Sequence, residues 1–424
     1  MTLPAADALR QLITRPLVYR LAEHLALRGE PERAALEKQI KDYVARSQLD
    51  WHTLVVPIDD DAPALFGAEV MLRTLSDIVA RHAYWRSREA AALLELYAAA
   101  RGLTRRELED RIIPSCGLGE LIDYGPRRFT LLLGERSTPL LRESGRRMRT
   151  SRPRPRRSDD QALVERATAD WNSYRRTLAL ESRVQSARME RAMVDGWRWT
   201  PDEFANSVLA HPLLSELARR LIWAGYDADG ALLECWSLAD QLSPVSDSYA
   251  PVRLERFAAI GLPHPVSVPP ARRLAWVELL SDFHTAPLFP QGGRPVYELT
   301  ETERAGEKIE RFGGATLDPS SFFTRLSNFS WQVGQSDEWI YALRVFEGVG
   351  VTAVLVFGYD DDGGHSFISD FFFAAGLLDS SSLAEDASTL PPPLPLRGVD
   401  PVVLSEALAD LSALTADPRL LVRS

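Results

Sequence analysis

The stretch DGWRWTPDEFANSVLAHPLLSELARRLIW, residues 195–223, carries three tryptophans, one histidine and an Arg-Arg pair. Thr200 can cap a helix, Pro201 suits the first helical position, and Glu203 can return a hydrogen bond to the cap. Pro212 ends this helix and starts another. The buried stripe expected for the second helix consists of Leu214, Leu217, Leu221 and Ala224. The stretch therefore predicts two short helices packed by their apolar faces.

His211 is the residue of this stretch that could carry chemistry. Its place directly before Pro212 favours an extended backbone. The imidazole could cap a neighbouring helix or act as a general base. A general base needs a nucleophile or acid as partner, and no spacing in the sequence supplies one. We therefore interpret His211 as structural and keep an enzyme of unrecognised class, with its site near His211, as an alternative.

Apolar residues recur at helical spacing on both sides of this stretch. They predict an N-terminal helical region over residues 1–115 and a helical core region over residues 159–295. The motif TRRE, from Thr104 to Glu107, is a capping box whose two ends can exchange hydrogen bonds. The first part of the core region, up to about Gly196, predicts one long helix with a buried stripe of aromatic and methionine side chains.

Strand-like patterns replace the helical period in two places. Residues 120–142, with Gly-Pro and Gly breaks, predict a small β meander, which shares the region 116–158 with an Arg-rich linker. Four strand-like runs predict a helix-plus-antiparallel-sheet unit over residues 296–378, with its sheet ending near residue 375. Residues 379–424 combine a Pro/Ser-rich linker with a C-terminal helix that begins at Asp400. The fold class expected is α+β and predominantly helical.

The composition is typical of a globular protein. A chain of 424 residues is too long for one ordinary core, and 45% hydrophobic with 25% charged residues suits a soluble protein. The N-terminus lacks the basic start and apolar run of a secretory signal. The longest apolar run is too short to cross a bilayer. We expect a cytoplasmic protein without membrane association.

The net charge of −10 is unevenly distributed along the chain. From Val296 to Ser424 there are 8 basic and 20 acidic residues. The acidity therefore belongs to the C-terminal third, whose surface should repel the phosphates of DNA.

No pattern in the sequence predicts a metal or a cofactor. Cys116 and Cys235 lie far apart and form no metal-binding motif. His264 and His284 lie at turns, and convergence with His211 on a metal lacks the support of a motif such as HExxH. The acidic run at residues 360–364 lacks the ligand spacing of a calcium loop and predicts a hairpin turn. Glycine motifs for nucleotide binding are absent as well.

Tryptophan and arginine side chains are the residues that most often anchor a protein partner. The two tryptophans that flank Arg198 are expected to be exposed in a turn before a helix. The Arg-Arg pair could grip an anion, and Arg294 stands beside a strand-like run where a groove could form. The candidates for partner binding are Trp197, Arg198, Trp199, Arg219, Arg220 and Arg294.

The linker after the meander is rich in arginine, with Glu143 as the one acid between residues 142 and 157. Several guanidinium groups could neutralise phosphates, and such binding would weaken steeply with salt. No aromatic residues are interleaved for base stacking, so a solvated linker is the favoured interpretation. The nucleic-acid candidates are Arg146, Arg147, Arg149, Arg152, Arg154, Arg156 and Arg157.

Several phrases together resemble a known family. They include DYGPRRFTLLLGE at 123–135, ARMERAMVDGWRWTPDEFANSVLAHPLLSELARRLIW at 187–223 and VDPVVLSEALADL at 399–411. Over roughly residues 100–415 the chain resembles a bacterial family of unknown function named molybdate-metabolism-regulator-like (MolR-like). The resemblance implies a bacterial source and a regulatory name, and it supplies no catalytic residues. The Trp-Gly-Arg module of longer members is absent from this sequence.

These observations favour a non-catalytic interaction or regulatory module in a bacterial cytoplasm, with another macromolecule, in the first place a protein, as its partner. The alternatives are a nucleic-acid-associated protein that uses the Arg-rich segment 146–157 and the enzyme with a site near His211.

Overall fold

The computed structural model describes residues 101–416, together with a few helical positions between residues 72 and 99. The gaps in the described range are residues 135–136, 144–147, 284, 314–315, 318–321, 324, 327–328, 336–339, 360–365 and 379–389. Most of the helical region expected over residues 1–115 therefore lies outside the described residues. Within it, the capping box is confirmed at helix α5 (Arg105–Arg111).

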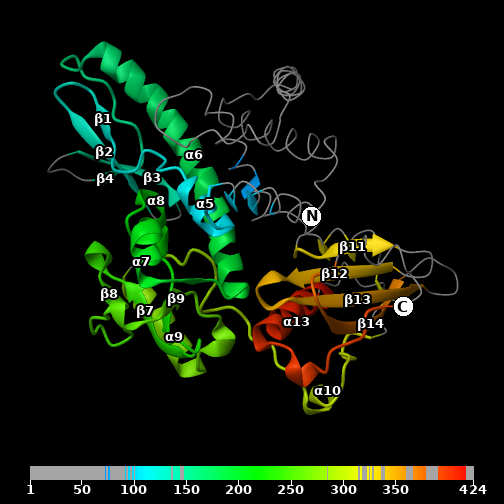
Figure 1. Ribbon diagram of the computed structural model, residues 1–424. Coiled ribbons are helices and arrows are strands. Elements are labelled where there is room, and N and C mark those ends of the chain that lie inside the picture. The colour runs from blue at the N-terminus through cyan, green and yellow to red at the C-terminus, as the bar shows by residue number, and fades with distance from the viewer. Residues whose placement is uncertain are drawn as a thin grey trace.

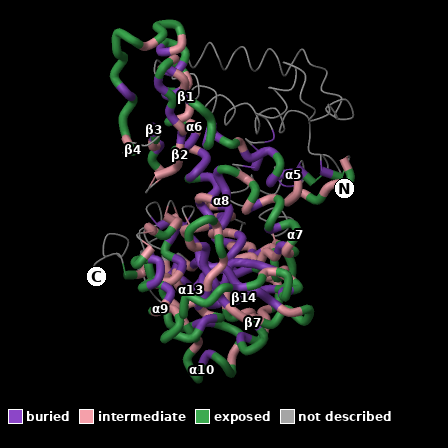
Figure 2. The backbone as a smooth tube through the Cα atoms, turned by 90° about the vertical axis from the view of Figure 1, so that its left-hand side faces the viewer, coloured by how far each residue is buried: buried purple, intermediate pink, exposed green. Residues whose placement is uncertain are grey.

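The described residues form three antiparallel sheets, of four, five and five strands, with helices packed against them (Figure 1). The expectation of a predominantly helical protein is therefore wrong. Two large hydrophobic cores lie within this arrangement. One joins the long helix α6 (Gln161–Val194) to two of the sheets, and the other lies between the third sheet and helix α13 (Pro401–Thr415). Buried stretches gather in the interior of the molecule, and exposed ones lie at its periphery (Figure 2).

The first sheet is the predicted meander. Its strands follow in the order β1-β2-β3-β4. Their bounds are β1 (Leu121–Asp123), β2 (Arg128–Leu133), β3 (Pro139–Glu143) and β4 (Met148–Arg149). Phe129, Leu131 and Leu141 are fully buried and share a core with Trp171 of α6. The meander thus buries its apolar face against the helix that follows it.

Helix α6 confirms the long helix predicted from the sequence. Asp160 caps it by accepting a hydrogen bond from the amide of Leu163. Its buried residues include Leu178 and Met189, which belong to the predicted stripe. With 34 residues the helix is about 50 Å long, so it extends from the meander to the second sheet.

The second sheet lies where the sequence predicts helices. Its order is β5-β9-β6-β7-β8. The strands are β5 (Arg198–Trp199), β6 (Trp223–Tyr226), β7 (Leu232–Leu238), β8 (Pro244–Val245) and β9 (Ala259–Gly261). Every residue of β6 is buried, so the alternation that identifies a half-buried strand is missing. Helix α8 (Pro212–Ala218) ends before Leu221, and Ala224 lies in β6, so the helical stripe predicted through these two residues is wrong.

Four aromatic rings fill the centre of this second sheet. Trp223 packs against Phe204, with ring centroids 4.7 Å apart, and against Trp199 at 5.8 Å. Trp236 stacks on Trp223 at 6.1 Å. Phe204 follows the short helix α7 (Pro201–Glu203), so the capped turn predicted at Thr200 delivers an aromatic ring into the core. Helix α9 (Pro270–Asp282) adds Trp276, which is also buried.

The C-terminal unit agrees with the sequence. Its sheet has the order β10-β14-β13-β12-β11. The elements are α10 (Glu301–Arg304), β10 (Thr316–Leu317), β11 (Gln332–Gln335), β12 (Ile340–Phe346), β13 (Val351–Tyr359) and β14 (Ser366–Ala375). Helix α13, capped by Asp400 as predicted, lies on one face of this sheet (Figure 1). Its Leu408 and Leu411 share a core with Phe371 and Phe373 of β14.

Gly225 of β6 offers a test of this packing. A methyl group there would overlap the ring of Phe257, which is buried, so the ring would have to move. We expect Gly225→Ala to lower the free energy of unfolding by about 1–3 kcal/mol, the usual effect of overpacking. Gly293 has open space and serves as control, with an expected change within about 0.5 kcal/mol for Gly293→Ala. Urea denaturation of both variants makes the comparison, and equal stabilities would contradict the packing.

Candidate functional site

A cleft of about 440 Å³ lies between α5 and the segment that carries β5 and α7. Arg106 and Asp110 of α5 contribute to one wall, and Trp197, Arg198 and Trp199 to the other. Three of the predicted binding residues are thus brought together at one concave surface. We call this surface the tryptophan cleft.

Two capping boxes shape the rim of the tryptophan cleft. The carboxylate of Glu107 accepts a hydrogen bond from the amide of Thr104 at 2.7 Å, and that of Glu203 accepts one from Thr200 at 2.7 Å. The hydrogen bonds from Thr104 also hold the pKa of Glu107 below its ordinary value. Both rim carboxylates are therefore hydrogen-bonded to the N-cap residues of α5 and α7.

The tryptophans lie deeper than the sequence suggests. Trp199 is 2% exposed and belongs to the core, so the expectation that both rings are exposed is wrong for this residue. Trp197 is partly exposed and lies between two guanidinium groups, with its ring centre 5.1 Å from Cζ of Arg106 and 5.7 Å from Cζ of Arg188. Cation–π attraction of this kind contributes about 0.5–2 kcal/mol for each ring and guanidinium and fixes the ring against the arginines.

A buried ion cluster supports the wall formed by α5. The guanidinium of Arg188, on α6, pairs with Asp110 and lies 3.6 Å from a carboxylate oxygen of Glu109. Although burial lowers the pKa of Arg188, the two carboxylates raise it above its ordinary value. Burial in turn raises the pKa of Glu109. Asp110 is consequently engaged by Arg188.

The arginines of the tryptophan cleft differ in whether a carboxylate of the protein pairs with them. Arg105 pairs with Glu95 at 3.2 Å and lies within 3.8 Å of two further carboxylates. The ion pairs among the described residues include neither Arg106 nor Arg198. Arg106 donates from Nη1 to the carbonyl of Arg198, and burial lowers its pKa. Arg198 lies over the ring of Tyr226 at 3.7 Å.

The Arg-Arg pair points to two different places. Arg219 pairs at 3.2 Å with Asp240, which is fully exposed. Arg220 donates to the carbonyl of Ala286 at 2.8 Å and to the hydroxyl of Ser137 at 3.1 Å. These two guanidinium groups therefore have separate partners and do not converge on one anion.

His211 caps helix α8. Its Nδ1 accepts hydrogen bonds from the amides of Leu213 and Leu214, each at 3.2 Å. Nε2 must then carry the proton, and it donates to the carbonyl of Ile113 at 3.0 Å. Burial lowers the pKa of His211, which favours this neutral form. Both ring nitrogens are occupied by backbone groups, as the structural interpretation requires.

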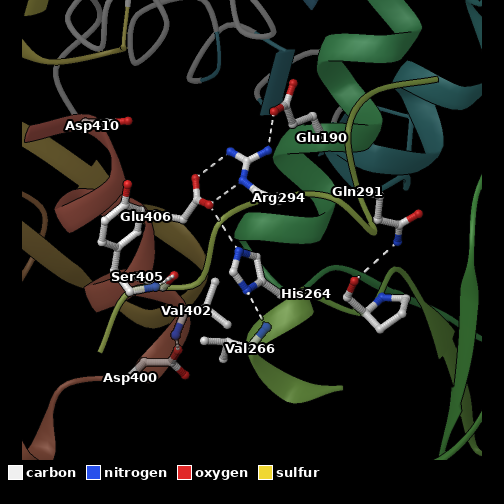
Figure 3. A network of polar contacts seen from close by, with 12 residues as sticks. Glu190, His264, Val266, Gln291, Arg294, Asp400, Val402, Ser405, Glu406 and Asp410 are labelled. Atoms are coloured by element: carbon white, nitrogen blue, oxygen red, sulfur yellow. Dashed lines mark hydrogen bonds and ion pairs between the residues drawn. The ribbon is translucent and has the colours of Figure 1, made fainter. Parts of the chain in front are cut away.

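Arg294 lies in a buried polar network that joins the two halves of the molecule, which are α6 with the first two sheets and the third sheet with α13 (Figure 3). It donates to both carboxylate oxygens of Glu406 on α13, at 2.6 and 2.7 Å, and it also pairs with Glu190 on α6. His264 donates from Nε2 to Glu406 at 3.0 Å, while its Nδ1 accepts from an amide of its own turn. Arg344 of β12 donates to the same carboxylate at 3.2 Å.

Glu406 is the centre of this network. It is 1% exposed, and burial alone would raise its pKa, but the donors from His264, Arg344 and Arg294 hold the pKa well below its ordinary value. The fork of Arg294 suits a bidentate pair with a carboxylate. Arg294 lies in the stretch between α9 and α10, which we call the connecting segment, and it therefore ties this segment to α6 and α13. The groove expected beside it is filled by Glu406.

The Arg-rich segment joins β4 to α6. Arg146 and Arg147 lie outside the described residues, and Arg149 is partly buried in β4. The four remaining candidates are exposed, and they are Arg152, Arg154, Arg156 and Arg157. The segment is not an isolated tether, because Pro153 is buried and its carbonyl accepts a hydrogen bond from the hydroxyl of Tyr124.

The two cysteines, Cys116 and Cys235, are buried thiols. In the part of the chain that the structure describes, no group of three His, Cys, Asp or Glu side chains could hold a metal ion. None of the helices described there combines the length and the apolar character needed to cross a membrane. His284, one of the histidines considered for a metal, falls in a gap.

Comparison with known proteins gives one matching domain model and one similar protein. Residues 145–331 match the model of DUF4132, a domain of unknown function. The chain is also similar to the uncharacterized protein YehI of Escherichia coli (strain K12), with 28% identity over 260 residues. That match covers 60% of this chain and 21% of YehI, so the chain spans about a fifth of the length of its relative. No solved structure matches. Neither similarity supports the molybdate-regulator label.

The DUF4132 match runs through α6, the second sheet and the connecting segment. It includes the tryptophan wall of the cleft and leaves out the wall formed by α5. Sequence reasoning identified Thr104 and Glu107 as a capping box but missed Arg106 between them. The sequence offered no signal for it, because capping boxes at Thr104, Thr200 and Thr300 look alike and the last of them does not line the cleft.

His211 can be tested through the pH dependence of stability. Its folded pKa lies below the unfolded value of about 6.5, so the stability that it provides is present above that pH and declines as the pH falls towards the folded pKa. In His211→Asn the amide can still cap α8 but cannot titrate. We expect the variant to lose less stability than the parent between about pH 7 and pH 5 in urea denaturation.

His211→Ala removes the cap as well and should cost about 1–2 kcal/mol at about pH 7.5. If His211→Asn and the parent have parallel stability curves across this pH range, a buried neutral imidazole is contradicted.

Glu406 provides a test of the network. Glu406→Gln leaves the guanidinium of Arg294 without its buried counter-charge and leaves Arg344 with Asp410 as its buried partner, so we expect a loss of about 3–5 kcal/mol in the free energy of unfolding. Glu190→Gln removes the partly exposed partner of Arg294, and it should cost about 0–1 kcal/mol. Denaturation monitored by tryptophan fluorescence measures both, and similar losses would show that burial of Glu406 is not decisive.

Proposed function

We propose that this protein is a non-catalytic interaction module that binds an acidic segment of a partner protein in the tryptophan cleft. The proposal rests on an observation about the charged side chains of the cleft: the carboxylates have partners within the protein, and two of the arginines have no carboxylate partner in the part of the chain that the structure describes. The carboxylates that line the cleft, Glu95, Glu107, Asp110 and Glu203, are engaged by Arg105, by Arg188 or by helix caps, whereas Arg106 and Arg198 have no ion-pair partner among the described residues.

Arg106 is suited to receive a carboxylate. Its guanidinium is partly buried, and burial lowers its pKa because water is removed from the charged form. One of its nitrogens donates to the carbonyl of Arg198, which fixes the plane of the group. A carboxylate from a partner would give Arg106 the direct ion pair that it lacks among the described residues, through charge-assisted hydrogen bonds, which are about twice as strong as neutral ones.

Trp197 adds an apolar surface beside this charge. Its partly exposed ring is held by Arg106 and Arg188, so it would lose little freedom when a partner side chain packs on it. Rigid tryptophan and arginine side chains are the residues that most often dominate the energy of an interface. The cleft therefore offers one anion-binding group and one aromatic surface close together.

The size of the cleft indicates the size of the bound segment. A volume of about 440 Å³ lies within the range of about 300–1,000 Å³ found for pockets that hold a small ligand. It accommodates a few side chains rather than a folded domain. The side chains that line it within the described residues include no histidine or cysteine. These features favour recognition over catalysis, in a cytoplasmic setting.

The prediction concerns Arg106. We expect a fluorescein-labelled peptide of about eight residues, rich in Asp and Glu and with one Leu, to bind the protein, and Arg106→Gln to weaken this binding at least about tenfold, or 1.4 kcal/mol. Fluorescence anisotropy gives the dissociation constants. A peptide with Lys in place of the acids should not bind. The matched control is Arg111→Gln, which removes the same charge from the exposed end of α5.

Absence of binding by the acidic peptide, or equal weakening in Arg106→Gln and Arg111→Gln, would contradict the proposal. Binding that is abolished by His211→Asn and retained in Arg106→Gln would also contradict the proposal, and it would favour a site near His211 instead. Circular dichroism of each variant shows whether its fold is intact.

A further inference from the structure

The segment from Arg149 to Arg157, which we call the arginine segment, is held in place by the meander. The hydroxyl of Tyr124 donates to the carbonyl of Pro153 at 3.2 Å. Arg127 donates to the carbonyl of Arg154 at 3.0 Å. Anchors at two successive residues fix the path of the backbone, which runs as an exposed loop beside β4 (Figure 2).

A buried ion pair strengthens these anchors. Arg127 is 8% exposed and donates from Nε to Asp159 at 3.0 Å. Asp159 also accepts a hydrogen bond from the amide of Arg156 at 2.7 Å, and Arg127 holds its pKa below the ordinary value. The anchors use the side chain of Arg127 and the backbone of the segment. The guanidinium groups of the segment itself therefore take no part in these anchoring hydrogen bonds.

Four of those guanidinium groups are both exposed and uncompensated. Arg152, Arg154, Arg156 and Arg157 are exposed, and no ion pair among the described residues includes them. The nearest acids in the sequence after the segment are Asp159, which pairs with Arg127, and Asp160, which caps α6. The segment therefore presents a local positive charge in a protein whose net charge is −10.

The spacing of the charges suits a regular polyanion. Arg152, Arg154 and Arg156 alternate with Pro153 and Pro155, in backbone that is neither helix nor strand. In extended chain, alternate residues recur about every 6.6 Å. Neighbouring phosphates along one strand of duplex DNA are farther apart than the axial rise of about 3.4 Å, because the strand winds around the axis, so arginines about 6.6 Å apart can contact successive phosphates. A row of this kind matches a nucleic-acid backbone better than it matches a single anion.

We propose that the arginine segment binds the phosphate backbone of double-stranded nucleic acid without sequence preference. Exposed aromatic side chains for stacking are not interleaved with the arginines, which disfavours single strands. Phosphate contacts position a protein on a duplex but do not specify sequence. The anchored backbone lowers the ordering cost of binding. The meander also lies at the end of the molecule remote from the acidic C-terminal unit (Figure 1).

The experiment uses the full chain and a fluorescein-labelled DNA duplex of about 20 bp and mixed sequence, titrated by anisotropy at several salt concentrations. The test variant replaces Arg152, Arg154 and Arg156 by alanine. We expect its affinity at low salt to fall at least about tenfold. The slope of log K against log salt should also become shallower by about 0.9 for each phosphate that the variant no longer neutralises.

The matched control replaces Arg166, Arg175 and Arg183 by alanine. These three residues are exposed on α6, so the control removes the same charge from a neighbouring surface. Its affinity should stay within about twofold of the parent. A variant with lysine at the three segment positions keeps the charge and should retain most of the binding, which separates loss of charge from loss of fold.

Three outcomes would overturn the proposal. Equal weakening of the test and control variants would show a general charge effect. Tighter binding to single-stranded oligo-dT of the same length than to the duplex would exclude a duplex site. Arginine-dependent binding to vesicles of phosphatidylglycerol and phosphatidylcholine, without binding to DNA, would assign the segment to a lipid surface. Arg106→Gln should leave DNA binding unchanged, so failure at the tryptophan cleft and failure here are distinguishable.

Discussion

The buried carboxylate of Glu406 is the interaction on which the relative placement of the two halves depends. Arg294 brings the connecting segment to it, Arg344 brings the C-terminal sheet, and His264 brings a turn of the first half. An ionised carboxylate in this position is stabilised by several donors, because burial removes the water that would otherwise solvate its charge. The network forms only when α13, the connecting segment, β12 and the turn of His264 are correctly placed relative to one another. Glu190 adds α6 to these elements.

A second buried cluster has the same effect at the tryptophan cleft. Arg188 on α6 pairs with Asp110 on α5 and at the same time lies under the ring of Trp197. The helix that carries Glu190 thus also positions the aromatic wall and the opposite wall of the cleft. Buried ion pairs of this type add little net stability, but they select one arrangement of the elements that bear them. Helix α6 consequently acts as the reference element for both networks.

The sequence predicted the local elements better than their assembly. Caps at Thr104, Thr200 and Asp400, the meander and the C-terminal sheet depend on neighbouring residues, and the structure confirms them. The second sheet was missed because β6 is buried at all of its residues and shows no alternation. The uncompensated state of Arg106 could not be predicted either. It depends on which carboxylates reach which arginines across 92 residues of sequence, as the hydrogen bond from Arg106 to Arg198 illustrates.

The two proposed binding regions lie towards opposite ends of α6. The arginine segment leads directly into its first turn at Gln161, and the tryptophan cleft is supported by Arg188 near its other end. At about 1.5 Å per residue these positions are about 40 Å apart along the helix axis. A single short ligand could not occupy both. Each region can therefore lose its arginines without altering the other.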